Sequence, residues 1–335
     1  MKLLITIPEG ELRDSFISGR TLELLRQHFD VTLNDIGRNY IPEELGVVAA
    51  DFDAVMTGWG TASLAEAGLL DGKHPLKLII HTGGSVGDLV DERAYRHGIT
   101  VISGNSMYAM STAEGALAYI MSALRYIPDD VSRMHDGEYW SSPYKTRGLF
   151  EREVGIIGVG AVSKNLMRFM KPFNVKLRVY DTYDVDPDFL REVNAVQTSL
   201  DEVLSKSSVV SLHAALGEKT RGMIGRDELK LISDGALFVN TSRGPIVDEA
   251  ALAEELSTGR FSAILDVFTH EPLSADSPLR KMDNVYLIPH KAGPTYDMRE
   301  VIGFKLAEDA VRHLSGEALQ FEITAEYAAR MTKHS

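Results

Sequence analysis

The sequence EVGIIGVGAVSKNLMRFM, residues 153–170, decides the fold of this chain. Its first five residues are rich in β-branched side chains and predict a buried strand, and its last ten residues predict a helix. Between them, Gly158 can turn the chain tightly and Gly160 lets the backbone approach a pyrophosphate. Ala161 and Val162 open the helix, where backbone N–H groups attract phosphate charge. The stretch, which reads G-x-G-x-x-S, therefore predicts a dinucleotide-binding unit.

An acidic residue follows at the distance that NAD recognition requires. Asp181 ends the next predicted strand, 21 positions after Gly160 (181 − 160). Its carboxylate can accept hydrogen bonds from the adenosine ribose hydroxyls and repels a 2′-phosphate. Thr182, Tyr183 and Asp184 come next, without a Lys or Arg that would attract that phosphate. The sequence therefore predicts NAD rather than NADP.

Short β-branched runs alternate with helical patterns along almost the whole chain, which predicts parallel sheets covered by helices on both faces. A helix is predicted over 107–125, and the irregular stretch 129–152, which contains Trp140, could be a linker. About 150 residues precede the glycine motif, enough for a separate first domain. The predicted strands are 3–7, 54–56, 76–80, 99–102, 154–159, 177–180, 209–212, 237–240, 264–267 and 285–288.

The composition limits the possible function classes. A net charge of −13 argues against a general nucleic-acid binder, which needs a basic surface. The chain has no cysteine, which excludes disulfides, thiol nucleophiles and thiolate metal sites. No apolar run approaches the roughly 18 residues that span a bilayer. The N-terminal MKLLITIPEGE lacks the apolar segment of a secretory signal, so a cytoplasmic location is expected.

Three later stretches resemble a known family. They read NTSRGPIVDEAAL (240–252), LDVFTHEPL (265–273) and NVYLIPHKAG (284–293). They resemble the arginine, acidic and histidine signatures of the D-isomer-specific 2-hydroxyacid dehydrogenases, in that family's order and spacing. The resemblance covers roughly residues 150–295, whereas the first 105 residues match only loosely.

The resemblance implies an α/β fold of two Rossmann-like, doubly wound parallel-sheet domains with a cleft between them. A substrate-binding domain would comprise residues 1–105 plus 296–335, and an NAD-binding Rossmann domain residues 106–295. It also implies a homodimer that moves a hydride between NAD and a small D-2-hydroxy acid or 2-oxo acid.

Reduction of a 2-oxo acid needs groups that hold the carboxylate, polarise the carbonyl and protonate its oxygen. Arg243 suits the first two tasks, because a guanidinium offers a planar fork of donors. His290 suits proton transfer near neutral pH. Glu271 can hydrogen-bond the imidazole and hold its tautomer. An isolated arginine, histidine or glutamate has structural alternatives, but three in this order, each after a predicted strand, point to one site.

Further residues are assigned to the cofactor by resemblance. Asp266 and the backbone around Thr241 would line the nicotinamide end, although Asp266 could instead cap a turn. His213 matches a family segment beside the cofactor, but Ala215 stands where the family usually has proline. We therefore expect His213 only to line that region.

The glycine turn GGSVGD at 83–88 is the candidate substrate turn. Consecutive N–H groups in such a turn form an anion-binding nest, which predicts that Ser85 and Val86 bind the substrate carboxylate. The turn lacks the family's usual acidic-then-asparagine ending, so a plain strand-to-helix connection is the alternative. Tyr108 could be a cleft or a core residue, and so could Trp140.

Lys291 follows His290, where the family normally has an apolar residue. It could face the cleft and favour a substrate with a second negative group, or it could point to solvent. No metal site is predicted, since residue 274 is Ser where a zinc protease motif beginning at His270 needs a second histidine. Two alternatives remain open on the same fold: an NAD(H)-responsive interaction protein without catalysis, and another reaction such as formate or phosphite oxidation.

Overall fold

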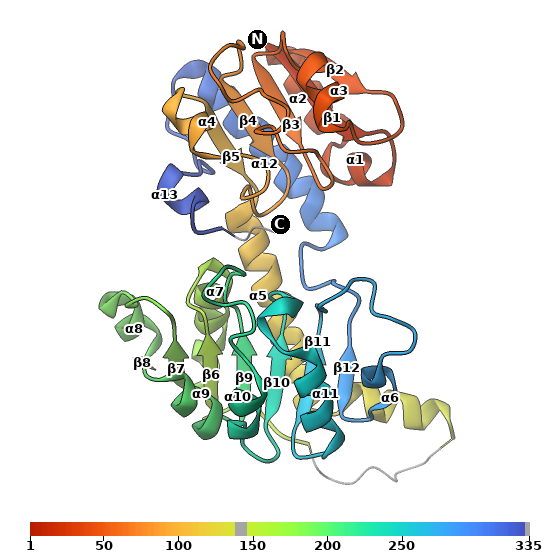
Figure 1. Cartoon of the computed structure of the whole chain (residues 1–335), viewed down its shortest axis with the longest axis vertical. Helices are drawn as coiled ribbons and strands as arrows, with labels where there is room; N and C mark the ends of the chain where they lie inside the picture. Colours follow the sequence, from red (N-terminus) through yellow and green to blue (C-terminus); the bar gives the residue numbers. More distant parts are fainter. Residues whose placement is uncertain (138–145, 332–335) are drawn as a thin grey trace. The chain divides into compact units, whose positions relative to one another are not determined.

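The computed structural model describes residues 1–137 and 146–331, and the chain divides into two compact units. Unit 1 comprises Met1–Tyr108 and Pro294–Ser335, and unit 2 comprises Ala109–Gly293. The division falls inside the helix α5 (Asn105–Leu124), which corresponds to the helix predicted over 107–125. Each unit contains one fully parallel sheet (Figure 1).

The sheet of unit 1 has five strands in the order β2-β1-β3-β4-β5. The order reverses between β1 and β3, because β2 lies on the outer side of β1 and the later strands continue from β3. Open parallel sheets bind ligands at such a switch point, outside the carboxyl ends of the strands. The strands are β1 (Lys2–Pro8), β2 (Asp30–Asn34), β3 (Ala54–Thr57), β4 (Leu78–His81) and β5 (Thr100–Ser103).

Helices cover both faces of this sheet because successive strand residues point to opposite sides. Leu3 and Ile5 of β1 pack in one core with helices α1, α2 and α12, and Leu4 packs in another with α3, α4 and α13. These helices are α1 (Glu11–Phe16), α2 (Gly19–His28), α3 (Pro42–Val48), α4 (Glu92–Arg96), α12 (Tyr296–Ser315) and α13 (Ala325–Ala328).

The sheet of unit 2 has seven strands in the order β12-β11-β10-β9-β6-β7-β8. Its switch point lies between β6 and β9, and β6 is the strand that precedes the glycine motif. The strands are β6 (Glu153–Ile157), β7 (Lys176–Tyr180), β8 (Ala195–Gln197), β9 (Val209–Leu212), β10 (Leu237–Asn240), β11 (Ser262–Leu265) and β12 (Val285–Leu287).

Two apolar cores separate this sheet from its helices. One core joins the sheet to α9, α10 and α11, and the other joins it to α5, α7 and α8. Both units are therefore doubly wound α/β domains, which confirms the predicted fold class. The helices are α7 (Ala161–Met170), α8 (Pro187–Val193), α9 (Leu200–Lys206), α10 (Arg226–Leu231) and α11 (Glu249–Ser257), with short 3-10 turns at Lys171–Phe173, Gly244–Ile246 and Pro278–Lys281.

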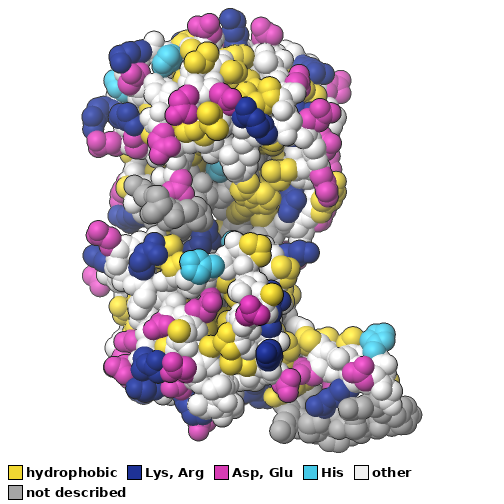
Figure 2. Space-filling view, turned by 45° about the vertical axis from the view of Figure 1, so that its right-hand side comes forward, with side chains coloured by type: hydrophobic (Ala, Val, Ile, Leu, Met, Phe, Trp, Pro, Cys, Tyr) yellow, Lys and Arg dark blue, Asp and Glu magenta, His cyan; other side chains and the backbone are white. Residues whose placement is uncertain are grey.

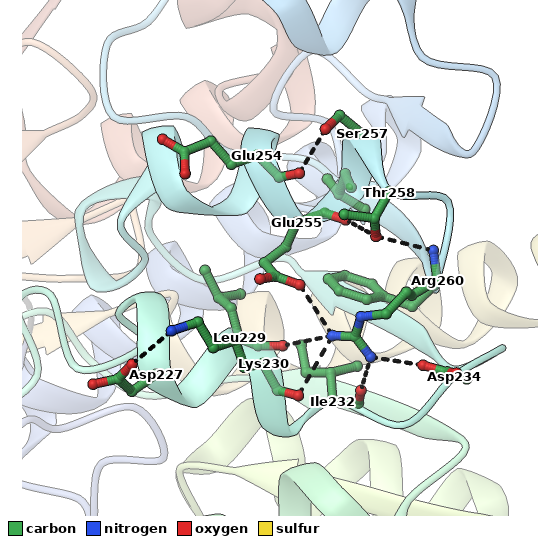
Figure 3. Close-up of polar contacts among 12 residues, drawn as sticks. Asp227, Leu229, Lys230, Ile232, Asp234, Glu254, Glu255, Ser257, Thr258 and Arg260 are labelled. Carbon is green, nitrogen blue, oxygen red and sulfur yellow. Dashed lines mark hydrogen bonds and ion pairs between the residues drawn. The ribbon is translucent and has the colours of Figure 1, made fainter.

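Arg260 links α10 to α11 in unit 2 (Figure 3). Its guanidinium donates to the carbonyl of Ile232 at 2.8 Å, just beyond the end of α10, and to Asp234 Oδ1 at 2.7 Å. It also donates to Glu255 Oε2 in α11 at 3.1 Å. Backbone carbonyls at the C-terminal end of a helix lack an intrahelical partner. The Arg260 side chain supplies a donor to one of them and also joins α10 to α11.

All ten predicted strands are present, but two strands and one helix were not predicted. The edge strands β2 and β8 are short and largely exposed or half-buried, so they lack the continuous apolar run that identifies a central strand. Helix α6 (Ile127–His135) overlaps the irregular stretch 129–152 that could be a linker, and none of the helix residues is buried. Residues 138–145, including Trp140, lie outside the described residues.

No helix within the described ranges is long and apolar enough to cross a membrane. Figure 2 shows Lys and Arg side chains interspersed with Asp and Glu over the face in view. That face presents no continuous basic area of the kind that contacts a nucleic-acid backbone.

Candidate active site

The three predicted catalytic residues all follow neighbouring parallel strands of unit 2. Arg243 follows β10, Glu271 follows β11 and His290 follows β12, and these three strands are adjacent in the sheet. Because parallel strands end at the same edge, the three segments lie at one edge of unit 2. The fold therefore gathers residues that are up to 47 positions apart in the sequence (290 − 243).

Glu271 and His290 form a hydrogen-bonded pair. The Nδ1 atom of His290 lies 2.7 Å from Oε2 of Glu271, and Oε1 of Glu271 accepts the N–H of Phe268 at 3.0 Å. Because a carboxylate only accepts hydrogen bonds, Nδ1 of His290 carries the hydrogen of this bond. Nε2 is then the ring nitrogen that can exchange a proton with another molecule. The side chains are 48% and 36% exposed for His290 and Glu271, so a small molecule can reach the pair.

The backbone of His290 is held in an uncommon conformation. Its φ is +51°, in the left-handed region that non-glycine residues rarely occupy. Its N–H donates to the carbonyl oxygens of Asp266 at 2.9 Å and Ile288 at 3.0 Å. Such conformations persist where surrounding contacts impose them, and they are frequent at active sites.

Asp266 supplies much of that support. It is 1% exposed, and its carboxylate accepts the N–H groups of Lys291 at 2.7 Å and Ala292 at 3.0 Å. Burial raises the pKa of Asp266, while these amide hydrogen bonds act in the opposite direction. These contacts join the end of β11 to the segment that follows β12. Lys291 itself presents an exposed side chain.

Arg243 begins the short 3-10 turn after β10. It is half-buried, and its Nη1 donates to the carbonyl of Ser242 at 2.7 Å. The glycine that follows is required for packing, since a Cβ at Gly244 would lie 2.0 Å from the carbonyl carbon of Phe268. The segment that carries Arg243 is therefore packed against the segment that leads to Glu271.

The glycine motif follows β6 at the switch point of unit 2. Gly158 has φ +91°, and a Cβ there would lie 2.4 Å from the backbone nitrogen of Ala214. Gly160 caps α7, and nothing lies within 4 Å of the position its Cβ would occupy. This open space beside the first N–H groups of α7, from Ala161 and Val162, fits a phosphate group. Ser163 is fully buried, as the packing position requires.

Asp181 directly follows the neighbouring strand β7 and is hydrogen-bonded to the glycine motif. Its Oδ2 accepts the N–H of Val159 at 2.6 Å, and its Oδ1 accepts the N–H of Tyr183 at 3.1 Å. An ionised carboxylate has further lone pairs for ribose hydroxyls. The Nζ of Lys219 lies 5.3 Å from the Tyr183 ring centroid. Sequence reasoning missed this cation because it comes from the loop after β9, far from Asp181 in the chain.

Two further predicted residues lie beside the motif or at the same edge. His213 follows β9, and its Nε2 lies 2.8 Å from Oγ of Ser211. Burial lowers the pKa of His213 to about 4, so the imidazole is neutral at pH 7. Thr241 is 7% exposed, and its hydroxyl oxygen is buried without a hydrogen-bond partner among the described residues. An unsatisfied buried hydroxyl at this edge fits a polar group of a bound cofactor.

The predicted substrate turn belongs to unit 1, after β4. Val86 is fully buried, and its N–H points to Sδ of Met331 at 3.5 Å, so that amide is already engaged. Oγ of Ser85 accepts the N–H of Gly87 at 3.2 Å. Within residues 1–137 and 146–331, no group of three or more His, Asp or Glu residues is placed to hold a metal ion.

Comparisons with known proteins show the family of this chain. Residues 117–292 match the family described as D-isomer specific 2-hydroxyacid dehydrogenase, NAD binding domain. A glyoxylate reductase from Aeropyrum pernix is 31% identical over 304 residues, which cover 88% of this chain and 90% of that protein. A crystal structure of a protein from Pyrococcus horikoshii superposes with a TM-score of 0.78 at 27% identity, covering 98% of this chain and 96% of the other.

A third relative is longer than this chain. It is a D-3-phosphoglycerate dehydrogenase from Archaeoglobus fulgidus, 29% identical over 317 residues. The match covers 94% of this chain but only 58% of the relative. Unit 2 carries the NAD-binding domain that the family description names, with its glycine motif at the switch point, and the chain belongs to the D-isomer specific 2-hydroxyacid dehydrogenase family.

Proposed function

We propose that this chain is an NAD-dependent oxidoreductase that interconverts a small D-2-hydroxy acid and the corresponding 2-oxo acid, with Arg243, Glu271 and His290 as catalytic residues. The observation that carries the proposal is the 2.7 Å contact between His290 and Glu271 at the edge of an NAD-binding sheet. Bound NADH would supply the hydride that reduces C2 of the 2-oxo acid.

His290 provides the proton in this reaction. Glu271 holds the hydrogen at Nδ1, so the proton on Nε2 is the one that moves to the C2 oxygen as the carbonyl becomes a hydroxyl. The imidazolium becomes neutral imidazole in the process, and the reverse reaction returns the proton to Nε2. The exposure of the pair is consistent with direct contact to substrate.

Arg243 binds and polarises the substrate. Its guanidinium can donate two parallel hydrogen bonds to the substrate carboxylate, or one to the carboxylate and one to the C2 oxygen. Charge that develops on the C2 oxygen is then stabilised by a fixed cation, which lowers the barrier more than it strengthens ground-state binding. On unit 1, we assign Ser85 and Val86 to the substrate carboxylate; in this structure the amide of Val86 contacts Sδ of Met331 at 3.5 Å.

The cofactor residues follow from the same geometry. We assign the pyrophosphate to Gly158, Gly160 and the first turn of α7 with Ala161 and Val162, and the adenosine ribose to Asp181. His213, Thr241 and Asp266 are assigned to the nicotinamide end. In this assignment the segment 106–295 binds the cofactor, and the segments 1–105 and 296–335 bind the substrate.

A panel of 2-oxo acids followed by NADH absorbance tests the proposal. Relatives are named D-3-phosphoglycerate dehydrogenase, glyoxylate reductase and hydroxypyruvate reductase, so the panel contains glyoxylate, pyruvate, hydroxypyruvate and 3-phosphohydroxypyruvate. We expect NADH oxidation with at least one of these acids. Tight NADH binding without turnover of any acid would instead support an interaction protein on the same fold.

We also propose that the chain forms a homodimer. Helix α6 exposes Ile127, Val131 and Met134, spaced four and three residues apart and therefore on one side of the helix. Sedimentation of the wild-type chain and of Val131→Asp should distinguish a dimer from a monomer. A monomeric wild-type chain would refute this part of the proposal.

A further inference from the structure

The switch point of unit 1 carries an exposed aromatic residue that the proposed chemistry does not use. The chain leaves β1 towards α1 and α2, and it leaves β3 towards the opposite layer, where Leu64 and Leu69 are buried. Trp59 lies two positions after the end of β3 and is 40% exposed. A large aromatic side chain is thus held where open parallel sheets bind ligands.

Arg299, from the first turn of α12, lies over this tryptophan. Its guanidinium carbon is 5.1 Å from the ring centroid of Trp59 and 5.9 Å from that of Phe16. The ring of Phe16 packs edge-on against Trp59 at 5.5 Å. Cation–π contacts orient the guanidinium but do not neutralise its charge.

The guanidinium of Arg299 has no counter-ion in the part of the chain that the structure describes. No carboxylate there lies within 4.0 Å of it, and its Nε is buried without a hydrogen bond. Withdrawing a charged donor from water without a partner costs free energy. Such an arrangement is expected where an anionic ligand completes the site.

Tyr108 supplies a second unsatisfied donor beside the same tryptophan. Its ring meets Trp59 edge-on at 6.1 Å, and its hydroxyl is buried without a hydrogen-bond partner among the described residues. Burial raises the pKa of this hydroxyl, so it remains a donor at neutral pH. The ring also packs against the predicted substrate turn, since a Cβ at Gly84 would lie 3.4 Å from its Cδ1 atom.

We propose that Arg299, Trp59 and Tyr108 form a subsite on unit 1 for a second negative group of the substrate, a carboxylate or a phosphate remote from the 2-oxo acid carboxylate. The inference rests on the proposed function, and it makes a 2-oxo acid with a second anionic group the preferred substrate. The guanidinium fork provides two donors to the anion and the Tyr108 hydroxyl a third, while Trp59 fixes the orientation of the fork.

Calorimetric titration of the full chain in the presence of NAD⁺ tests the subsite without turnover, because oxidised cofactor cannot reduce a 2-oxo acid. The probes are pyruvate as a monoanion, 2-oxoglutarate as a dicarboxylate and 3-phosphohydroxypyruvate as a phosphorylated acid. Arg299→Met should weaken binding of 2-oxoglutarate, of 3-phosphohydroxypyruvate or of both by about tenfold or more, and that of pyruvate by less than about twofold. Comparison of the dicarboxylate with the phosphorylated acid shows whether a carboxylate or a phosphate is the preferred group. The affinity of Arg299→Lys for these acids should lie between those of the wild-type chain and Arg299→Met, because an ammonium keeps the charge but lacks the fork of donors.

Arg20→Met is the matched control. Arg20 is an exposed arginine stacked on the ring of Phe304 in the same helix α12, at 3.8 Å. Its replacement removes the same charge and a similar stacking contact, and all three affinities should stay unchanged. Arg299→Gln also removes the charge but keeps a polar side chain. It is used in the titrations instead of Arg299→Met if Arg299→Met lowers the midpoint of thermal unfolding.

Three results would overturn the subsite. In the first, Arg299→Met weakens the binding of pyruvate, 2-oxoglutarate and 3-phosphohydroxypyruvate equally. In the second, Arg299→Met leaves the affinity for every probe unchanged. In the third, the wild-type chain binds neither 2-oxoglutarate nor 3-phosphohydroxypyruvate more tightly than pyruvate. Failure of the proposed function is a separate observation, namely no NADH oxidation with any acid, and the titrations still decide on the subsite in that case.

Discussion

Glu271 contacts the ring of His290 with one carboxylate oxygen and the backbone of its own loop with the other. Oε2 lies 2.7 Å from Nδ1 of His290, and Oε1 accepts the N–H of Phe268. The hydrogen bond to Phe268 restrains the carboxylate, so the imidazole is oriented by a group that is itself held in place. Residues of this kind affect catalysis through geometry as well as charge.

His290→Ala should lower kcat by about 10²–10⁴-fold, because the proton donor is lost, while NADH binding remains largely intact. Steady-state kinetics together with NADH fluorescence titration measure both effects. His270→Ala is the control, since His270 is exposed and lies next to Glu271 in sequence. Near-normal turnover of His290→Ala would mean that another group donates the proton.

Glu271→Gln should lower kcat by about 10-fold or more, since a neutral amide holds the imidazolium less strongly than a carboxylate does. Glu249→Gln is a matched control, because Glu249 is the first residue of α11 and contacts the loop that carries Glu271. Oε2 of Glu249 accepts the N–H of Thr269 at 2.8 Å, and no contact joins Glu249 to the imidazole among the described residues. Similar losses in both variants would show that Glu271 acts only on loop structure.

The position of Asp181 predicts a cofactor preference. We expect kcat/KM to be at least about tenfold higher with NADH than with NADPH, roughly 1.4 kcal/mol. Asp181→Ala should narrow that gap, because the ribose acceptor and the repulsion of a 2′-phosphate are both removed. Lys219→Ala should widen it if the ammonium near Tyr183 favours a 2′-phosphate. Equal use of both cofactors by the wild-type chain would refute the assignment of Asp181.

Arg260→Met should destabilise the chain by about 1–3 kcal/mol, because carbonyls at the C-terminal end of α10 lose a charged donor. Arg226→Met is the comparison. Arg226 also links α10 to α11, through an exposed ion pair with Glu254, and such pairs contribute about 0–1 kcal/mol. Urea unfolding of both variants measures the difference. Equal destabilisation would mean that the carbonyl contacts of Arg260 add nothing beyond the ion pairs.

His81 predicts a loss of stability in mild acid. Burial lowers the pKa of His81 to about 4, whereas an exposed histidine has a pKa near 6.5. Above about pH 6.5 neither state binds the proton, and between 6.5 and 4 only the unfolded chain does, so stability falls as the pH falls through this window. The loss at pH 5 should be about 2 kcal/mol. Urea unfolding at pH 7.5 and pH 5 measures it.

His81→Gln should be less stable than the wild-type chain at pH 7.5, since Nδ1 of His81 lies 2.9 Å from Oγ1 of Thr57. It should nevertheless lose less stability between the two pH values. His28→Gln replaces an exposed histidine and should keep the wild-type dependence. A pH dependence unchanged by His81→Gln would contradict the prediction.

The sequence predicted most of the fold because its central strands are buried on both faces. A strand such as β9, with four fully buried residues, must be almost wholly apolar and is visible as a run. The edge strands β2 and β8 and the helix α6 were not predicted, because they bury few residues and can therefore be polar. The residues that we propose as catalytic were predicted from signatures that also set their spacing along three adjacent strands.

The cluster on unit 1 could not be predicted from the sequence. Trp59, Tyr108 and Arg299 are separated by up to 240 positions (299 − 59), and each alone is an ordinary residue. Only the fold shows that two donors lack partners there. The contacts of Asp266 could not be predicted either, since the amide groups that donate to its carboxylate come from a loop that begins 25 residues later.

The two glycines of the nucleotide motif carry different information about relatives of this chain. Any side chain at position 158 would collide with backbone atoms next to β9, so a descendant that abandoned its cofactor would still have to keep that glycine in order to fold. Position 160 has ordinary φ and empty surroundings, and the folded chain would tolerate a side chain there. Among homologues, replacement of the second glycine, and not retention of the first, should therefore mark the lineages that have lost the nucleotide.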